Sequence, residues 1–214
     1  MFNAIFYTQW KWSRLLLLVA TFAGLAIPLV SIQSINEAYG NFEVVHTIQG
    51  YGIGYPLLAA CLGLLLSLTA WGSDHRGRHV YALSLPIPRW HYVMLRYISG
   101  LLLLLAPILA VWIGGTLATH FIKIPAGLEA YSGSLAVRFA LCALLAYTAF
   151  FAISAGTPRT AGIVLGIGAG LVAAQVLLSA AGIEVQLLKP IVDGLFIWPG
   201  PFEIFTGRWM LLDV

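Results

Sequence analysis

Residues 97–118 read YISGLLLLLAPILAVWIGGTLA, and this segment decides the fold class of the chain. It has no charged residue and carries consecutive leucines from Leu101 to Leu105. A helix needs about 20 mostly apolar residues to cross the hydrocarbon core of a bilayer. Residues 97–118 are therefore long and apolar enough to span a membrane as one helix.

Four further stretches have a similar composition. A single charge, Arg138, interrupts them. The alternating pattern of a membrane barrel is absent, so helices are the form in which these stretches can cross lipid. We predict an all-α, polytopic membrane helix bundle with five spans, in which the other four occupy residues 15–32, 54–71, 135–155 and 161–181.

The composition of the whole chain agrees with this prediction. Of its 214 residues, 60% are hydrophobic and 9% are charged, whereas soluble domains carry about 25% charged residues. A soluble enzyme, a nucleic-acid-binding protein and a disordered chain are therefore disfavoured. Cys61 and Cys142 lie within apolar runs and are too few for a disulfide framework or a zinc site.

The two ends of the chain differ from the spans. Residues 1–14 mix aromatic and polar side chains and predict an amphipathic helix in the membrane interface, or else a frayed start of the first span. Residues 185–206 contain the sequence WPGP and predict a re-entrant segment on the outer side.

The positive charges predict the orientation. Lys11 and Arg14 precede the first span, four arginines lie in residues 73–96, and residues 33–53 contain neither Lys nor Arg. Basic residues collect on the cytoplasmic side of membrane proteins. We therefore expect the N-terminus and residues 73–96 to face the cytoplasm. We also expect residues 1–214 to form a single transmembrane domain.

Catalytic motifs are missing from the sequence. It has no phosphate-binding loop, no zinc-protease motif and no nucleophile elbow. We expect no catalytic residue, no resident metal and no ATPase site in this chain. His75 and His79, next to Asp74, would share a helix face. They belong either to a hydrated, basic connection, to a metal site, or to an enzyme that acts on lipid at the cytoplasmic interface. Arg138 either reaches the interface or lines a substrate path.

Residues 73–96 are too long and too structured for a simple turn. Ser73 or Asp74 can cap a short helix, Pro86 and Pro88 would end it, and Arg89 would start the next helix. Such a helix on the cytoplasmic face either rests on lipid or docks a cytoplasmic protein.

Small residues repeat along the fifth predicted span. Gly162, Gly166 and Gly170 are four residues apart and stack on one helix face. Such a face lets two helices approach closely, within one chain or between chains.

The pattern from Asp74 to Arg89 resembles the cytoplasmic loop of type-2 ATP-binding cassette exporter permeases. Those loops carry an acidic residue, a Gly and a Leu-rich stretch that ends in Ser-x-Pro-x-x-Arg, although Glu often replaces Asp74 and Thr often replaces Arg78. Residues 1–14 are similar to the elbow helix of that family, and residues 207–213 resemble the lead into its sixth span. Because members of the family usually have six spans, the resemblance implies that the sixth span is missing or truncated at Val214, so that the chain is either cut short or a five-span variant.

The resemblance implies a permease subunit that moves a substrate by alternating access. Two separate cytoplasmic ATPase subunits would bind ATP and Mg and dock beneath it, and a second permease chain would complete a homodimer or heterodimer. It implies the bacterial cytoplasmic (inner) membrane, contact with the lipid bilayer and no nucleic-acid partner. The alternative is a structural or anchoring membrane subunit without transport activity. The docking residues implied are Asp74, Arg76, Arg78, Val80, Tyr81, Leu83, Leu85 and Arg89.

Overall fold

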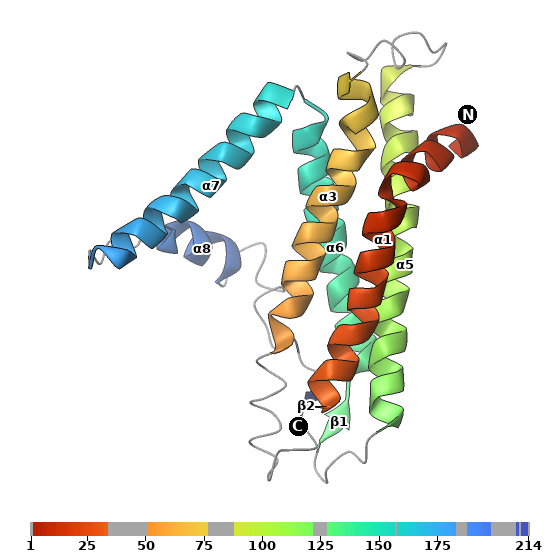
Figure 1. Cartoon of the computed structure of the whole chain (residues 1–214), viewed down its shortest axis with the longest axis vertical. Helices are drawn as coiled ribbons and strands as arrows, with labels where there is room; N and C mark the ends of the chain where they lie inside the picture. The colour runs from red at the N-terminus through yellow and green to blue at the C-terminus, as the bar shows by residue number, and fades with distance from the viewer. Residues whose placement is uncertain are drawn as a thin grey trace. The chain divides into compact units, whose positions relative to one another are not determined.

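The computed structural model describes residues 2–33, 51–76, 88–121, 128–156, 158–182, 188–197, 209 and 211–213. The chain forms two compact units, of which the first comprises residues 1–151 and 208–214, and the second residues 152–207. Figure 1 shows the elements along the chain. The described elements are α1 (Phe2–Gln33), α3 (Gly54–Arg76), α5 (Arg89–His120), β1 (Glu129–Ala130), α6 (Ser132–Ser154), α7 (Pro158–Ala180), α8 (Lys189–Phe196) and β2 (Leu212–Asp213).

Five of the described helices are long and apolar enough to cross a membrane. They coincide with the five predicted spans and confirm the all-α polytopic bundle. All five begin or end beyond the apolar runs. For example, α3 continues past Trp71 to Arg76, and α5 begins at Arg89 rather than at Tyr97. Helical hydrogen bonds continue into these polar ends, and the backbone groups of the terminal turns are left for water, side chains or caps.

Helix α1 is continuous from Phe2 to Gln33. The predicted interfacial helix and the first span are therefore parts of one helix, without a break at Arg14. Figure 1 shows that the first part of α1 is inclined to the rest. Two polar residues of this part, Gln9 and Ser13, are buried, which places one of its faces against the other helices. Its position in the membrane interface stays a prediction.

Glycine residues allow the helices of the first unit to approach closely. A Cβ at Gly24 would lie 3.1 Å from Val111 Cγ2 of α5, and a Cβ at Gly114 would lie 2.9 Å from the carbonyl oxygen of Leu25 in α1. A Cβ at Gly63 of α3 would lie 2.6 Å from the backbone nitrogen of Tyr147 in α6. Small residues at such crossings are typical of helix packing in membranes. In Figure 1 these four helices run side by side.

A two-stranded sheet closes one end of this unit. β1 pairs with β2 in antiparallel register, Glu129 with Asp213 and Ala130 with Leu212. Trp209 is buried beside the sheet and stacks on Tyr55 of α3, with ring centroids 6.3 Å apart. The described part of residues 207–213 is thus tied back onto the bundle, whereas the sequence predicts the lead into a further span.

Arg138 lies near this closed end. Its guanidinium carbon is 5.8 Å from the centroid of the Trp209 ring, a cation–π arrangement. The residue is half-buried. Arg138 therefore takes part in holding the Trp209 segment against α6.

The second unit contains α7 and α8. Helix α7 ends before Gly182, which has a φ of +74°, a conformation that glycine adopts without steric cost. The side-chain oxygen of Gln175 accepts a hydrogen bond from the backbone N–H of Leu188 at 3.5 Å, just before α8. Helix α8 lies within the predicted re-entrant segment, and the WPGP turn falls outside the described residues.

The glycine crossing between α3 and α6 gives a stability prediction. Replacement Gly63→Ala should lower the free energy of unfolding by about 1–3 kcal/mol, because its methyl group would meet backbone atoms that cannot move aside easily. Gly72→Ala in the same helix is the matched control, since no described atom lies within 4 Å of its Cβ. The control should be neutral or stabilising by up to about 1 kcal/mol.

Thermal unfolding in a mild detergent, followed by circular dichroism, measures both variants. Equal midpoints for Gly63→Ala and Gly72→Ala would contradict the close packing of α3 against α6.

Candidate functional site

The candidate site is formed by the two helix ends that flank residues 77–87. Helix α3 leads into this segment and ends at Arg76, and α5 leaves it at Arg89. Pro88 caps α5, and its carbonyl oxygen accepts hydrogen bonds from the N–H groups of His91 and Tyr92 at 3.0 and 3.2 Å. Proline is tolerated at this N-cap because an N–H group there would have no partner within the helix.

A buried ion pair joins the two helix ends. Arg96 Nη1 of α5 donates a hydrogen bond to Asp74 Oδ2 of α3 at 2.6 Å. The Tyr92 hydroxyl lies 3.2 and 3.0 Å from the two oxygens of the same carboxylate. Tyr92 and Arg96 are four residues apart and share one face of α5. All three side chains are buried, with Asp74 only 3% exposed.

Charged side chains that are buried away from water are stable only when they are paired and hydrogen-bonded. The carboxylate of Asp74 meets this requirement through two donors that both come from the neighbouring helix. Because the donors belong to α5, the stabilisation of the buried charge depends on α3 and α5 remaining together. The interaction is therefore a tertiary link and not a local cap.

The predicted capping role of Ser73 and Asp74 is wrong. Both residues lie inside the last turns of α3, which continues to Arg76, so neither begins a new helix. The carboxylate of Asp74 binds Tyr92 and Arg96 instead of the backbone N–H groups of a following helix.

Aromatic rings surround the ion pair. The guanidinium carbon of Arg96 is 5.4 Å from the ring centroid of Trp71, which lies one turn before Asp74 on α3. Trp71 contacts Phe151 of α6 with centroids 5.2 Å apart, and Phe151 contacts Tyr97 at 5.3 Å. Rings over a desolvated cation add roughly 2 kcal/mol of attraction. The aromatic cluster thereby extends the link from α3 and α5 to α6.

Helix α1 reaches the same region through Gln9. A Cβ at Gly100 of α5 would overlap the hydroxyl of Tyr147 and would lie 3.0 Å from Gln9 Nε2. Only glycine leaves room here for the polar groups of α1 and α6 beside α5. Gln9 is 4% exposed, so its amide is part of the interior. Four helices therefore converge at the end of the unit that carries the ion pair.

The structure describes part of the predicted docking set. Asp74 is buried in the ion pair, Arg89 is exposed in the first turn of α5, and Arg76 is the last residue of α3. The side chain of Arg76 and the predicted docking residues from 78 to 85 fall outside the described residues. Contact of this set with an ATPase stays a prediction.

The sequence analysis did not identify Tyr92, Arg96 and Trp71 as site residues. One signal was available, since Asp74 and Arg96 carry opposite charges next to the two apolar runs that flank residues 77–87. Opposite charges at two such positions can meet across the bundle when the flanking helices are antiparallel neighbours.

The glycine face of α7 is open in the structure. Gly162, Gly166 and Gly170 are exposed, and no described atom lies within 4 Å of a Cβ placed on any of them. Within the second unit, no described residue covers this small-residue face, and its packing partner stays a prediction.

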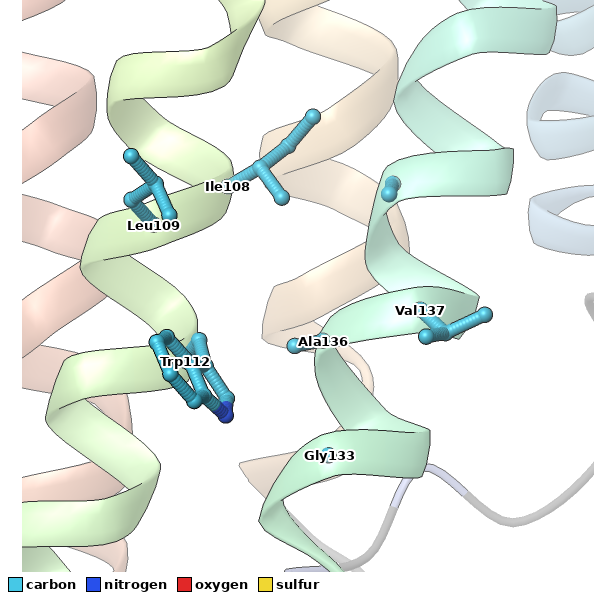
Figure 2. Close-up of a pocket in the computed structure, with 7 residues that line it drawn as sticks. Ile108, Leu109, Trp112, Gly133, Ala136 and Val137 are labelled. Atoms are coloured by element: carbon cyan, nitrogen blue, oxygen red, sulfur yellow. The ribbon is translucent and has the colours of Figure 1, made fainter.

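An apolar groove lies between α5 and α6. It has a volume of about 310 Å³. Figure 2 shows Trp112 directed toward the gap between the helices, with Gly133 and Ala136 on the opposite side. Apart from the indole nitrogen of Trp112, its lining side chains are hydrocarbon, so the groove supplies no group for acid–base or nucleophilic chemistry. It is lined by Ile108, Leu109, Trp112, Gly133, Ala136, Val137 and Ala140.

Within the described ranges, no three His, Cys, Asp or Glu side chains gather in a way that could hold a metal ion. The arrangement at the Asp74 end is one that joins helices, since both oxygens of the carboxylate accept hydrogen bonds from side chains of α5.

The energetic link between Asp74 and Arg96 can be measured by a double-mutant cycle. Asp74→Asn and Arg96→Gln should each lower the free energy of unfolding by about 3–5 kcal/mol, because each leaves a buried polar partner without its counterpart. The double variant should lose clearly less than the sum of the two.

Unfolding in mixed micelles with a denaturing detergent provides the measurement. Tyr131→Phe, which removes a hydrogen bond to Glu129 at the sheet end, is the control. Strictly additive losses for Asp74 and Arg96 would show that the two residues are not coupled.

The comparisons with known proteins identify the family. A family model described as ABC-2 family transporter protein matches residues 6–198. Neither the curated proteins nor the solved structures gave a match. The matched residues include four of the five candidate membrane spans in full and the first span from residue 6 onward. The chain is a multi-pass membrane protein that belongs to the ABC-2 family of transporter proteins, the membrane permease components of ATP-binding cassette transporters.

Proposed function

We propose that this permease subunit moves its substrate by alternating access and is driven by separate ATPase subunits that bind residues 76–89. The observation that carries the proposal is the structure of the two ends of this segment. Helices α3 and α5 lead directly from it into the membrane, and the buried pair of Asp74 and Arg96 joins them. A force applied to the segment would therefore reach two spans at once.

The charges at this end support a cytoplasmic location. Lys11 and Arg14 are exposed on the first part of α1, and Arg89 is exposed at the start of α5. Figure 1 shows the beginnings of α1 and α5 at the same end of the first unit. Accumulated Lys and Arg favour the cytoplasmic side. The N-terminus and the docking segment would then face the same compartment as the ATPase, at the inner membrane of a bacterium.

The proposed mechanism assigns binding and transmission to this chain. ATP and Mg would bind to the partner ATPase, and no residue of this chain would take part in hydrolysis. Arg76, Arg78 and Arg89 would pair with acidic groups of the ATPase, and the apolar residues between them would fill a cleft. ATP binding can favour one permease state only through contacts that differ between the states, and the docking segment would make those contacts.

A second permease chain would complete the pathway. The open small-residue face of α7 is compatible with close packing against another membrane helix, because glycine allows two helix backbones to approach. The few charges within the spans suit a hydrophobic or amphipathic substrate.

Charge reversal tests the docking segment. The double variant Arg76→Glu/Arg78→Glu should lower the amount of ATPase that co-purifies with the tagged chain by at least about tenfold, since like charges across an interface cost several kcal/mol. Mild-detergent purification from the native membrane, followed by quantitative mass spectrometry, measures the ratio.

The control is Lys123→Glu/Lys189→Glu, which reverses two charges on the predicted outer side and should leave the ratio unchanged. Wild-type complexes without an ATPase would overturn the proposal and favour an anchoring subunit. An unchanged ratio in the Arg76 and Arg78 variant would exclude those two residues as docking groups.

The proposed orientation gives an independent prediction. Trp90 and Phe121 are exposed at opposite ends of α5. In a background without Cys61 and Cys142, a membrane-impermeant thiol reagent added to intact spheroplasts should label Phe121→Cys and spare Trp90→Cys. Opening the membrane should make both sites reactive. Labelling of Trp90→Cys and not of Phe121→Cys in intact spheroplasts would show that the orientation is the opposite of the one proposed.

A further inference from the structure

We propose that Asp74, Tyr92 and Arg96 form a clamp that makes the ends of α3 and α5 move as one body when residues 77–87 are displaced. These are positioning residues, because they act through the segment that they hold. The coupling role rests on the proposed function, whereas the rigid link between the helices does not.

The clamp lies at the two points where a displacement would enter the bundle. Asp74 is two residues before the end of α3, and Tyr92 and Arg96 lie in the first two turns of α5. Without a link between them, the two helix ends could separate or slide past each other when residues 77–87 are displaced, and the rest of α3 and α5 would not move. With the link, the same displacement must tilt both helices.

The contacts are directional and come from both helices. α3 supplies the carboxylate and the Trp71 ring, and α5 supplies the guanidinium and the Tyr92 hydroxyl. The guanidinium carbon of Arg96 also lies 5.1 Å from the Tyr92 ring centroid. The Asp74 carboxylate thus has two partners on α5, and the Arg96 guanidinium has two partners on α3. Rotation or sliding of one helix against the other would break several of these interactions together.

Burial makes the clamp stiff. Asp74, Tyr92 and Arg96 are each at most 5% exposed. Water cannot easily replace the broken hydrogen bonds at such a site, and salt screens a buried pair weakly. An exposed ion pair at the same place would exchange with solvent and transmit little force.

The clamp also matters because α3 and α5 share little other surface. Both helices pack more extensively against α1 than against each other. In the part of the chain that the structure describes, the ion pair and its surrounding rings are the main polar connection between these two helices. Loss of the clamp should therefore loosen their ends without dismantling the bundle.

The rigid link is tested on the permease alone in lipid nanodiscs. Spin labels at Gly72→Cys and Trp90→Cys, in a background of Cys61→Ser and Cys142→Ala, report the distance between the two helix ends. Gly72 has open space around its Cβ and Trp90 is 67% exposed, so both sites accept a label. The wild-type chain should give one narrow distance distribution.

Asp74→Asn should widen this distribution about twofold or more, because a neutral amide holds the guanidinium far less strongly than a carboxylate does. Tyr92→Phe removes only one hydroxyl and should give an intermediate width, so it carries the test if Asp74→Asn does not fold. Tyr131→Phe removes a hydroxyl at the sheet end and should leave the width unchanged. Equal widths in the wild-type chain and Tyr92→Phe would overturn the clamp.

The coupling role is tested in the complex with its ATPase. Labels at Ile53→Cys and Phe121→Cys, both exposed and far from the clamp, should report a distance change when a non-hydrolysable ATP analogue and Mg are added. Asp74→Asn should reduce the amplitude of that change about fivefold or more while the ATPase stays bound, since transmission depends on a two-state element that both sites bias.

The two failures are distinguishable. If no ATPase binds the wild-type chain, the proposed function fails, and the nanodisc measurement still decides whether the rigid link exists. If the ATPase binds and Asp74→Asn gives the full wild-type amplitude, the clamp does not transmit the displacement and the inference is overturned.

Discussion

In a bilayer, the backbone N–H and C=O groups of a spanning segment must be satisfied inside the segment itself, because the hydrocarbon offers no hydrogen-bonding partner. This constraint turns the long apolar runs of the chain into α1, α3, α5, α6 and α7. A buried charge at the end of a span needs hydrogen-bonding partners, and Asp74 finds them on α5.

Once the helices are formed, burial of apolar surface no longer selects their neighbours, since lipid tails are as apolar as leucine side chains. Close approach and polar contacts decide the arrangement instead. Gly24 and Gly114 bring α1 and α5 together, Gly63 brings α3 to α6, and Gly100 admits the hydroxyl of Tyr147. At these positions the absence of a side chain allows the close contact, so an added methyl group would collide with the neighbouring helix.

The polar groups of the first unit are distributed unevenly, and that distribution links the fold to the function. The buried acid and base lie together beside the segment that would meet an ATPase, inside a layer of aromatic rings. The opposite end is closed by the small sheet and by Trp209, whose ring contacts both Tyr55 and Arg138. The groove between α5 and α6 is apolar throughout except for one indole nitrogen. The buried ion pair at the Asp74 end joins α3 and α5, which would suit that end to the proposed mechanical input.

The sequence by itself determined the number and approximate limits of the spans and the transporter family, because hydropathy over about 20 residues and a loop pattern are local properties. It could not show that α1 is continuous through Arg14, that residues 211–213 return to pair near Glu129, or that Asp74 serves as an ion-pair partner instead of a helix cap. Those features depend on which helices become neighbours. Only the tertiary structure brings Asp74 and Arg96 within 2.6 Å, since the energy of a buried charge is set by groups that are distant in the sequence and close in space.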